Sequence, residues 1–216
     1  MARLVFDLDG TLVDSAPTLA ATGNRMLAEL GRPPVSLETC IGFIGHGVRH
    51  LVGRLLDHTG GVPSEGVEPW FRRFRAIYDA DPLTGTVVYP GVPAALAALA
   101  GAGHGLGVCT QKFVTPARAI LEGLDLMPPI EGLTGGDSVG VLKPDPRMLA
   151  HAADQLPPGP VLYVGDSLTD AETAQAAGVP FLLHARGYRL QPVEALPHAA
   201  VFDDFVDLPA LVAALA

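Results

Sequence analysis

Short apolar runs alternate with helix-like segments through most of this 216-residue chain, and this alternation constrains the fold more than any other feature. The runs are continuously apolar, so both faces of each predicted strand are expected to be buried. Strands are predicted at residues 4–6, 106–109, 161–164 and 181–183, with a weaker one at 199–202, and helices at 92–100, 115–124, 146–155 and 170–177. The pattern predicts an α/β fold with a doubly wound parallel sheet.

Residues 16–84 interrupt the alternation, because they contain several helical runs and no convincing strand. Helices are predicted there at 17–30, 48–57 and 67–78. We therefore expect residues 16–84 to form an inserted all-helical cap, and residues 1–15 and 85–216 to form the α/β core. The two crossings lie near Ser15 and Gly85, an arrangement that suits hinge motion of the cap over the core.

Composition narrows the range of partners and compartments. The net charge of −9 repels phosphate backbones and anionic lipids, so neither nucleic acid nor a membrane surface is expected as a partner. The first apolar run is cut by Asp7 and Asp9 before a secretory signal could form. Cys40 and Cys109 lie far apart and are predicted to be reduced, buried thiols, which favours the cytoplasm. The oligomeric state does not follow from the sequence.

Carboxylates follow two of the predicted strands. Asp7 and Asp9 come directly after the first strand, and Asp166 and Asp170 follow the strand at 161–164. Ligands of open α/β sheets bind beyond the carboxyl ends of the strands, so these side chains are expected to converge. Carboxylates that repel each other persist together where a cation offsets the repulsion, and an all-oxygen site with a phosphate to complete it favours Mg²⁺. Asp170 could hold the metal through a water or orient its ligands.

Four motifs in chain order carry a resemblance to a known family. Residues 7–15 (DLDGTLVDS) resemble the first motif of the haloacid dehalogenase superfamily, Thr110 matches its second, Lys143-Pro144 its third and residues 165–170 (GDSLTD) its fourth. The helical insertion directly after the first motif is similar to the cap of phosphoglycolate phosphatases. The resemblance implies a Rossmann-like core and a Mg²⁺-dependent phosphatase of a small phosphorylated metabolite, with 2-phosphoglycolate as the expected substrate.

The resemblance also implies roles for individual residues. Asp7 would attack phosphorus to form an aspartyl-phosphate, and Asp9 would protonate the leaving oxygen and then activate water. The Mg²⁺ would be held by Asp7, Asp9 through its backbone carbonyl, and Asp166, with Asp170 in support. The expected phosphate-binding residues are Gly10, Thr110, Gln111 and Lys143.

Two positions of the second motif qualify this assignment. Gln111 departs from the Asn that the family often shows, which weakens any role for its side chain. Lys112 is expected to be a surface charge or to support the site from outside.

Within the superfamily, other positions must decide the reaction. Asp9 argues against carbon–halogen hydrolysis, which needs no acid at that position. The absence of lysine from residues 16–84 excludes a Schiff-base route to phosphonoacetaldehyde cleavage. Two alternatives stay open: a hexose-phosphate mutase of the β-phosphoglucomutase type, and a non-catalytic phosphate-binding module on the same fold.

Within the cap, one segment is a candidate for substrate recognition, namely the glycine-rich residues 42–51. It resembles the specificity loop of phosphoglycolate phosphatases, and amides at a helix start favour an anion such as a carboxylate. His46, Arg49 and Arg54 are therefore the expected specificity residues of the cap. The alternative is a helix start with a solvent-facing Arg49. A metal pair of His46 and His50 has no recognisable further ligand in the sequence.

Overall fold

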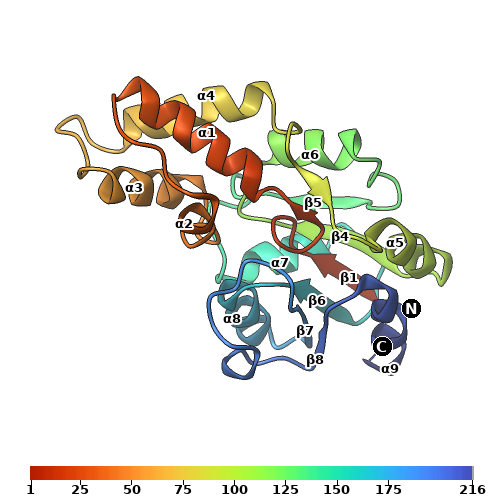
Figure 1. Ribbon diagram of the computed structural model, residues 1–216. Helices are drawn as coiled ribbons and strands as arrows, with labels where there is room; N and C mark the ends of the chain where they lie inside the picture. Colours follow the sequence, from red (N-terminus) through yellow and green to blue (C-terminus); the bar gives the residue numbers. More distant parts are fainter. Residues whose placement is uncertain (216) are drawn as a thin grey trace.

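The computed structural model describes residues 1–215, and its centre is a six-stranded sheet whose paired strands all run parallel (Figure 1). The strands are β1 (Arg3–Phe6), β4 (Gly105–Cys109), β5 (Gly132–Thr134), β6 (Val161–Gly165), β7 (Phe181–His184) and β8 (Ala200–Phe202). Their order is β5-β4-β1-β6-β7-β8, so the chain adds two strands on one side of β1 and then returns to add three on the other. The predicted doubly wound α/β fold is confirmed.

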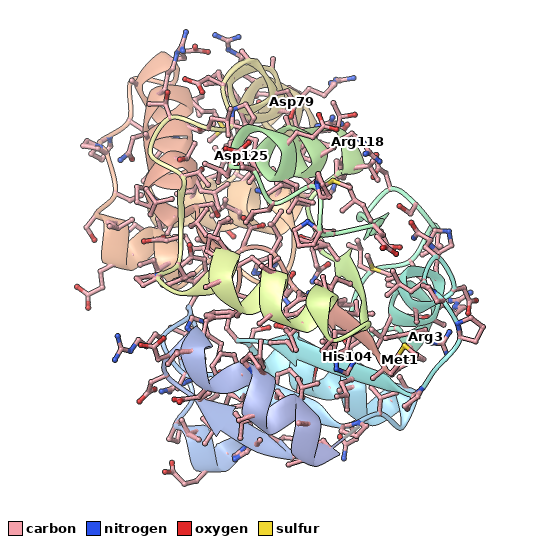
Figure 2. All side chains as sticks on the ribbon, turned by 90° about the vertical axis from the view of Figure 1, so that its right-hand side faces the viewer. Met1, Arg3, Asp79, His104, Arg118 and Asp125 are labelled. Carbon is pink, nitrogen blue, oxygen red and sulfur yellow. The ribbon has the colours of Figure 1, made fainter. Side chains whose placement is uncertain are left out.

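Helices cover both faces of the sheet, and the side-chain alternation along β1 shows which helices each face meets. Leu4 and Phe6 join an apolar cluster with α5, α6 and α9, whereas Val5 joins a second cluster with α7 and α8. These helices are α5 (Val92–Gly101), α6 (Val114–Gly123), α7 (Pro146–Ala153), α8 (Leu168–Ala177) and α9 (Leu208–Leu215). Figure 2 views the molecule from the side of α5 and α9, which lie against each other. Burial on both faces explains the continuously apolar strands.

Residues 16–80 carry four helices that bury an apolar cluster of their own, around Leu27, Leu55 and Phe74. The helices are α1 (Ala16–Glu29), α2 (Leu37–Ile41), α3 (Val48–His58) and α4 (Glu68–Ala80). At the two crossings, β2 (Val13–Asp14) and β3 (Val87–Val88) pair as a short antiparallel ribbon. We propose on these grounds that residues 16–84 act as a cap hinged at this ribbon.

The structure adds short elements that the sequence pattern did not predict. Strand β5 has three residues and begins with a glycine, and the ribbon strands have two residues each, so neither produces a detectable apolar period. Helix α2 spans five residues, and two single-turn helices, η1 (Val193–Ala195) and η2 (Phe205–Asp207), follow β7. Across residues 1–215, every helix is too short or too polar to cross a membrane.

Candidate active site

The candidate site lies where the direction of strand addition reverses, between β1 and β6. In a parallel sheet, the loops beyond the carboxyl ends of two such strands diverge and leave a crevice between them. Asp7 follows β1 and Asp166 follows β6, so the two carboxylates enter the crevice from opposite sides. Thr110 follows β4, the other neighbour of β1. The fold therefore brings together residues that are more than 150 positions apart.

Asp7 is held in a defined orientation. Its Oδ1 accepts a hydrogen bond from the backbone N–H of Leu8 at 2.7 Å and lies 3.0 Å from the Nζ of Lys143. Burial raises the pKa of Asp7 to about 7, and the nearby Lys143 opposes that rise. Both contacts fall on Oδ1, so Oδ2 is left to accept a cation or to attack an electrophile.

Lys143, in the loop after β5, supplies a buried positive charge. Its Nζ lies 2.6 Å from Asp170 Oδ1 and 3.1 Å from the Tyr163 hydroxyl, in addition to the contact with Asp7. Burial alone would lower the pKa of Lys143, but the carboxylates of Asp170 and Asp7 raise it above its usual value. The ammonium group therefore stays charged beside Asp7.

Asp170 is saturated by neighbours. Its Oδ1 accepts from Lys143 and, at 2.8 Å, from the Tyr163 hydroxyl, whereas its Oδ2 accepts from the backbone N–H and hydroxyl of Ser167 and from the Asp166 N–H. Burial raises the pKa of Asp170, but Lys143 outweighs this and the net shift is downward. Ser167 and Asp170 also form a capping box that begins α8. Of the two roles expected for Asp170, the structure favours orientation of the ligands.

Asp166 is the carboxylate that needs a cation most. Its Oδ1 accepts from the Thr11 hydroxyl at 3.1 Å and its Oδ2 from the Tyr188 N–H at 2.6 Å. Burial raises its pKa well above the ordinary value, and the negative charges of Asp170 and Asp7 add to the rise. One oxygen from each of Asp7, Asp166 and Asp170 lies within 4.8 Å of the others. A buried, all-oxygen set of this kind fits a hard divalent cation such as Mg²⁺.

Gly10 makes the close approach of Asp166 possible. Its φ of +83° is favourable for glycine, and a Cβ atom at this position would overlap the Asp166 carboxylate. The Gly10 N–H donates to the Val13 carbonyl at 2.9 Å, and the Gly10 carbonyl accepts from the Nδ1–H of His184 at 3.0 Å. The structure thus uses Gly10 to seat a carboxylate, and the N–H of this predicted phosphate-binding residue is engaged inside the loop.

Asp9 lies on the cap side of Asp7 and stays partly exposed. Its Oδ1 accepts a hydrogen bond from the Ser15 hydroxyl and lies 3.2 Å from the Nζ of Lys112. Ser15 occupies the first crossing into the cap, so the hinge and the proposed acid are directly linked.

The two polar residues that open the loop after β4 face different partners. The Thr110 hydroxyl accepts the Lys112 N–H at 3.1 Å, which leaves its own hydrogen to donate to a ligand. The Gln111 amide donates at 2.7 Å to the carbonyl of Gly45 in the cap loop. Gln111 therefore joins core to cap, a contact that the sequence did not indicate.

A cavity of about 50 Å³ lies between these groups and the cap. Asp7, Asp9, Thr110, Gln111 and Lys112 line the core side. The cap side is apolar and consists of Leu19, Ile44, Val48 and Leu51, together with two glycines of the cap loop. By the measure that gives one water about 10–15 Å³, the cavity has room for roughly three to five water-sized groups.

The expected specificity residues of the cap lie away from the cavity lining. Arg49 pairs with Glu68 on the cap surface, and its side chain is 62% exposed. The Arg54 guanidinium lies 4.9 Å from the centre of the Phe43 ring. His46 packs edge-on against His50, with ring centres 5.0 Å apart.

Lys112 differs from its prediction as a surface charge, because it is buried beneath the cap. Its Nζ donates at 2.8 Å to the hydroxyl of Tyr78 on α4 and pairs with Asp9. The surface alternative was wrong because α4 covers this residue from 34 positions away in the sequence, whereas the pair with Asp9 fits the other alternative, a charge that supports the site. Tyr188 was missed for the same reason: its contacts with Asp166, Asp14 and Ser15 all span more than 20 residues.

Comparisons with known proteins agree with this arrangement. A family model described as haloacid dehalogenase-like hydrolase matches residues 1–178. A phosphoglycolate phosphatase of Cereibacter sphaeroides is 46% identical over 98% of this chain and 97% of its own length, and one from Rhodospirillum rubrum is 44% identical over 95% and 88%. The crystal structure of a predicted phosphoglycolate phosphatase from Haemophilus somnus superposes with a TM-score of 0.90, at 29% identity and 97% coverage of both chains.

The family match spans the strands and loops that carry Asp7, Thr110, Lys143 and Asp166. These findings confirm the predicted family and the prediction of a phosphoric monoester hydrolase. The chain belongs to the haloacid dehalogenase-like hydrolases.

Proposed function

We propose that this protein hydrolyses 2-phosphoglycolate, in a Mg²⁺-dependent reaction through an aspartyl-phosphate on Asp7. One observation carries the proposal: Asp7 and Asp9 line one small cavity beneath the cap, and Lys143 and Asp166 lie beside Asp7 in the core. Each has a partner that fixes its orientation, as a preorganised site for phosphoryl transfer requires.

In the first step, a carboxylate oxygen of Asp7 attacks phosphorus, and the bond from phosphorus to the ester oxygen breaks. The two negative charges of the phosphate must be offset for a third to approach, so positive charge and hydrogen bonds dominate the barrier. The free hydroxyl hydrogen of Thr110 is available to a phosphoryl oxygen, and the positive charge of Lys143, 3.0 Å from Asp7, offsets negative charge beside the nucleophile. Asp9 gives its proton to the departing oxygen of glycolate.

In the second step, Asp9 takes a proton from water and the resulting hydroxide attacks phosphorus. The bond between phosphorus and the Asp7 oxygen breaks, which releases phosphate. Asp7 and Asp166 would hold the metal, and Asp170 orients this region through Lys143 and the Asp166 N–H. When bound, Mg²⁺ offsets the negative charge of the phosphoryl oxygens and of the two buried carboxylates. Tyr188 and Thr11 keep Asp166 facing the site.

The substrate proposal draws on two further observations. Relatives 44–46% identical to this chain are named phosphoglycolate phosphatases. The cap side of the cavity is apolar, and the side chains of Leu19, Ile44, Val48 and Leu51 offer no hydrogen-bond partners to the hydroxyl groups of a hexose. A phosphate-binding module would need neither the attacking carboxylate nor the acid, whereas here both line the cavity.

The setting in the cell is also a proposal. Both cysteines are free and buried, which suits a reducing compartment, and we place the protein in the cytoplasm with a free small metabolite as its substrate.

The test is release of inorganic phosphate from a panel of 2-phosphoglycolate, glucose 1-phosphate, glucose 6-phosphate and p-nitrophenyl phosphate. The metal is first removed with a chelator and Mg²⁺ is then restored. We expect 2-phosphoglycolate to give the highest kcat/KM and the activity to return only with the metal. A higher kcat/KM on a glucose phosphate would contradict the proposed substrate, and full activity without Mg²⁺ would contradict the metal dependence.

A further inference from the structure

The basic residue that faces the cavity beside Asp9 is Lys112. Its side chain is 2% exposed, and two of its three N–H groups point to Asp9 and Tyr78. Lys143, the other lysine of the chain, contacts Asp7, Asp170 and Tyr163 at the phosphate end. The ammonium group of Lys112 therefore faces the cavity, whereas that of Lys143 belongs to the core network around Asp7 and Asp170.

Asp9 marks the leaving-group end, because the acid must reach the ester oxygen. Lys112 Nζ lies 3.2 Å from the carboxylate of Asp9, and Asp9 and Tyr78 take two of its N–H groups. Its third N–H is therefore available to a group of the substrate next to the ester oxygen. A neutral leaving group offers this ammonium at most a hydroxyl oxygen, which is a weaker acceptor than a carboxylate. An anionic one would be repelled by the Asp7 carboxylate in the same cavity unless a cation stood beside it, and Lys112 is that cation.

Tyr78, on α4 of the cap, contacts Lys112 from outside the cavity lining. Its oxygen accepts from Lys112, which leaves the hydroxyl hydrogen to donate, and burial raises the pKa of Tyr78 so that the group stays protonated. The Lys112 ammonium also lies 4.5 Å from the centre of the Tyr78 ring.

From this geometry we infer that Lys112, positioned by Tyr78, is the specificity-determining residue that binds a carboxylate on the leaving group. The inference rests on the proposed function and deepens it, because the carboxylate of glycolate is attached to the carbon that bears the ester oxygen. It moves anion recognition from the cap arginines to the core. Arg49 is occupied by Glu68 and Arg54 by the Phe43 ring, and neither lines the cavity.

The test compares two substrates that differ in one group, 2-phosphoglycolate and 2-hydroxyethyl phosphate. For Lys112→Met, we expect the ratio of their kcat/KM values to fall about 10- to 100-fold, the range for a lost hydrogen bond to a charged group. Any disturbance of Asp9 lowers both values alike and cancels in the ratio. Tyr78→Phe should lower the ratio about 3- to 10-fold, because it removes one neutral hydrogen-bonding group and keeps the ring.

Arg75→Met is the matched control. Arg75 lies one turn before Tyr78 on α4, pairs with Asp79 at 3.0 Å and stacks on Phe113, outside the cavity. In Arg75→Met, the ratio of kcat/KM for 2-phosphoglycolate to that for 2-hydroxyethyl phosphate should equal the ratio in the wild-type protein. Circular dichroism of each variant shows whether it has folded, and Tyr78→Phe still tests the inference if Lys112→Met does not fold.

The outcomes distinguish failure of the Lys112 inference from failure of the proposed substrate and of the phosphatase proposal. An unchanged ratio in Lys112→Met, or in a folded Tyr78→Phe if the first variant is unfolded, overturns the inference and leaves the phosphatase proposal standing. An unchanged protein that hydrolyses 2-hydroxyethyl phosphate but not 2-phosphoglycolate overturns the proposed substrate together with the inference. An unchanged protein that hydrolyses neither overturns the phosphatase proposal itself.

Discussion

The two ends of the cavity are built differently. At the phosphate end, Asp7, Lys143, Asp166 and Asp170 hold one another through hydrogen bonds and ion pairs within the α/β core. At the cap end, the lining is mostly apolar, and the polar links to the cap, at Gly45 and Tyr78, both reach residues of the loop after β4.

The difference separates two tasks. A network fixed inside one rigid unit keeps the reacting groups in place whatever the cap does. A cap held by few polar links can move and can change its lining without disturbing the chemistry. We therefore expect changes at the phosphate end to abolish turnover, and changes at the cap end to alter substrate binding.

The largest effect is expected from Asp7→Asn, which removes the attacking oxygen and keeps the shape of the side chain. The kcat should fall by about 10³-fold or more on every phosphate ester. The measurement is phosphate release, and Asp154→Asn, at a carboxylate that is 80% exposed, is the matched control with normal turnover. Ordinary turnover by Asp7→Asn would rule out covalent catalysis at this position.

Asp9→Asn should lower kcat by roughly 10²- to 10⁴-fold on 2-phosphoglycolate, because the leaving alkoxide then departs without a proton. The loss should be smaller on p-nitrophenyl phosphate, whose leaving group is stable as an anion. Equal losses on the two substrates would contradict the assignment of Asp9 as the acid. Because Asp9 lies between the phosphate end and the cap end of the cavity, comparing kcat for the two esters shows which end its role belongs to.

Gly10→Ala should weaken the apparent affinity for Mg²⁺ by about 10-fold, because a methyl group would displace the Asp166 carboxylate. Titration of activity with Mg²⁺ and calorimetric binding of the metal give two readouts. Gly178→Ala is the matched control: Gly178 also has a positive φ, of +67°, but nothing lies within 4 Å of its added methyl group. Equal metal affinity in both variants would show that Gly10 serves only the turn.

The smallest effect is expected from Gln111→Met, which removes the hydrogen bond to Gly45 and keeps the length of the side chain. A single neutral hydrogen bond of about 1 kcal/mol corresponds to a roughly fivefold rise in KM, with kcat nearly unchanged. Steady-state kinetics on 2-phosphoglycolate separates the two parameters. A large fall in kcat at constant KM would place Gln111 at the phosphate end and break the comparison.

Local pattern explains how much of the fold the sequence predicts. The apolar runs that became β1, β4, β6 and β7 were predicted within one residue, because each is buried on both faces. Strand β5 was missed, since it has three residues and depends on its pairing with β4.

The sequence by itself determined which chemistry the chain can carry. Asp7, Thr110 and Asp166 follow apolar strands, and parallel strands present their carboxyl ends at one edge, so their convergence follows from the pattern alone.

Only the tertiary structure decided how that chemistry is enclosed. Tyr78, on α4, covers Lys112 in the loop after β4, and Tyr188 fixes Asp166 from the loop after β7. Neither contact has a local period, because each depends on how distant segments pack after the sheet has formed.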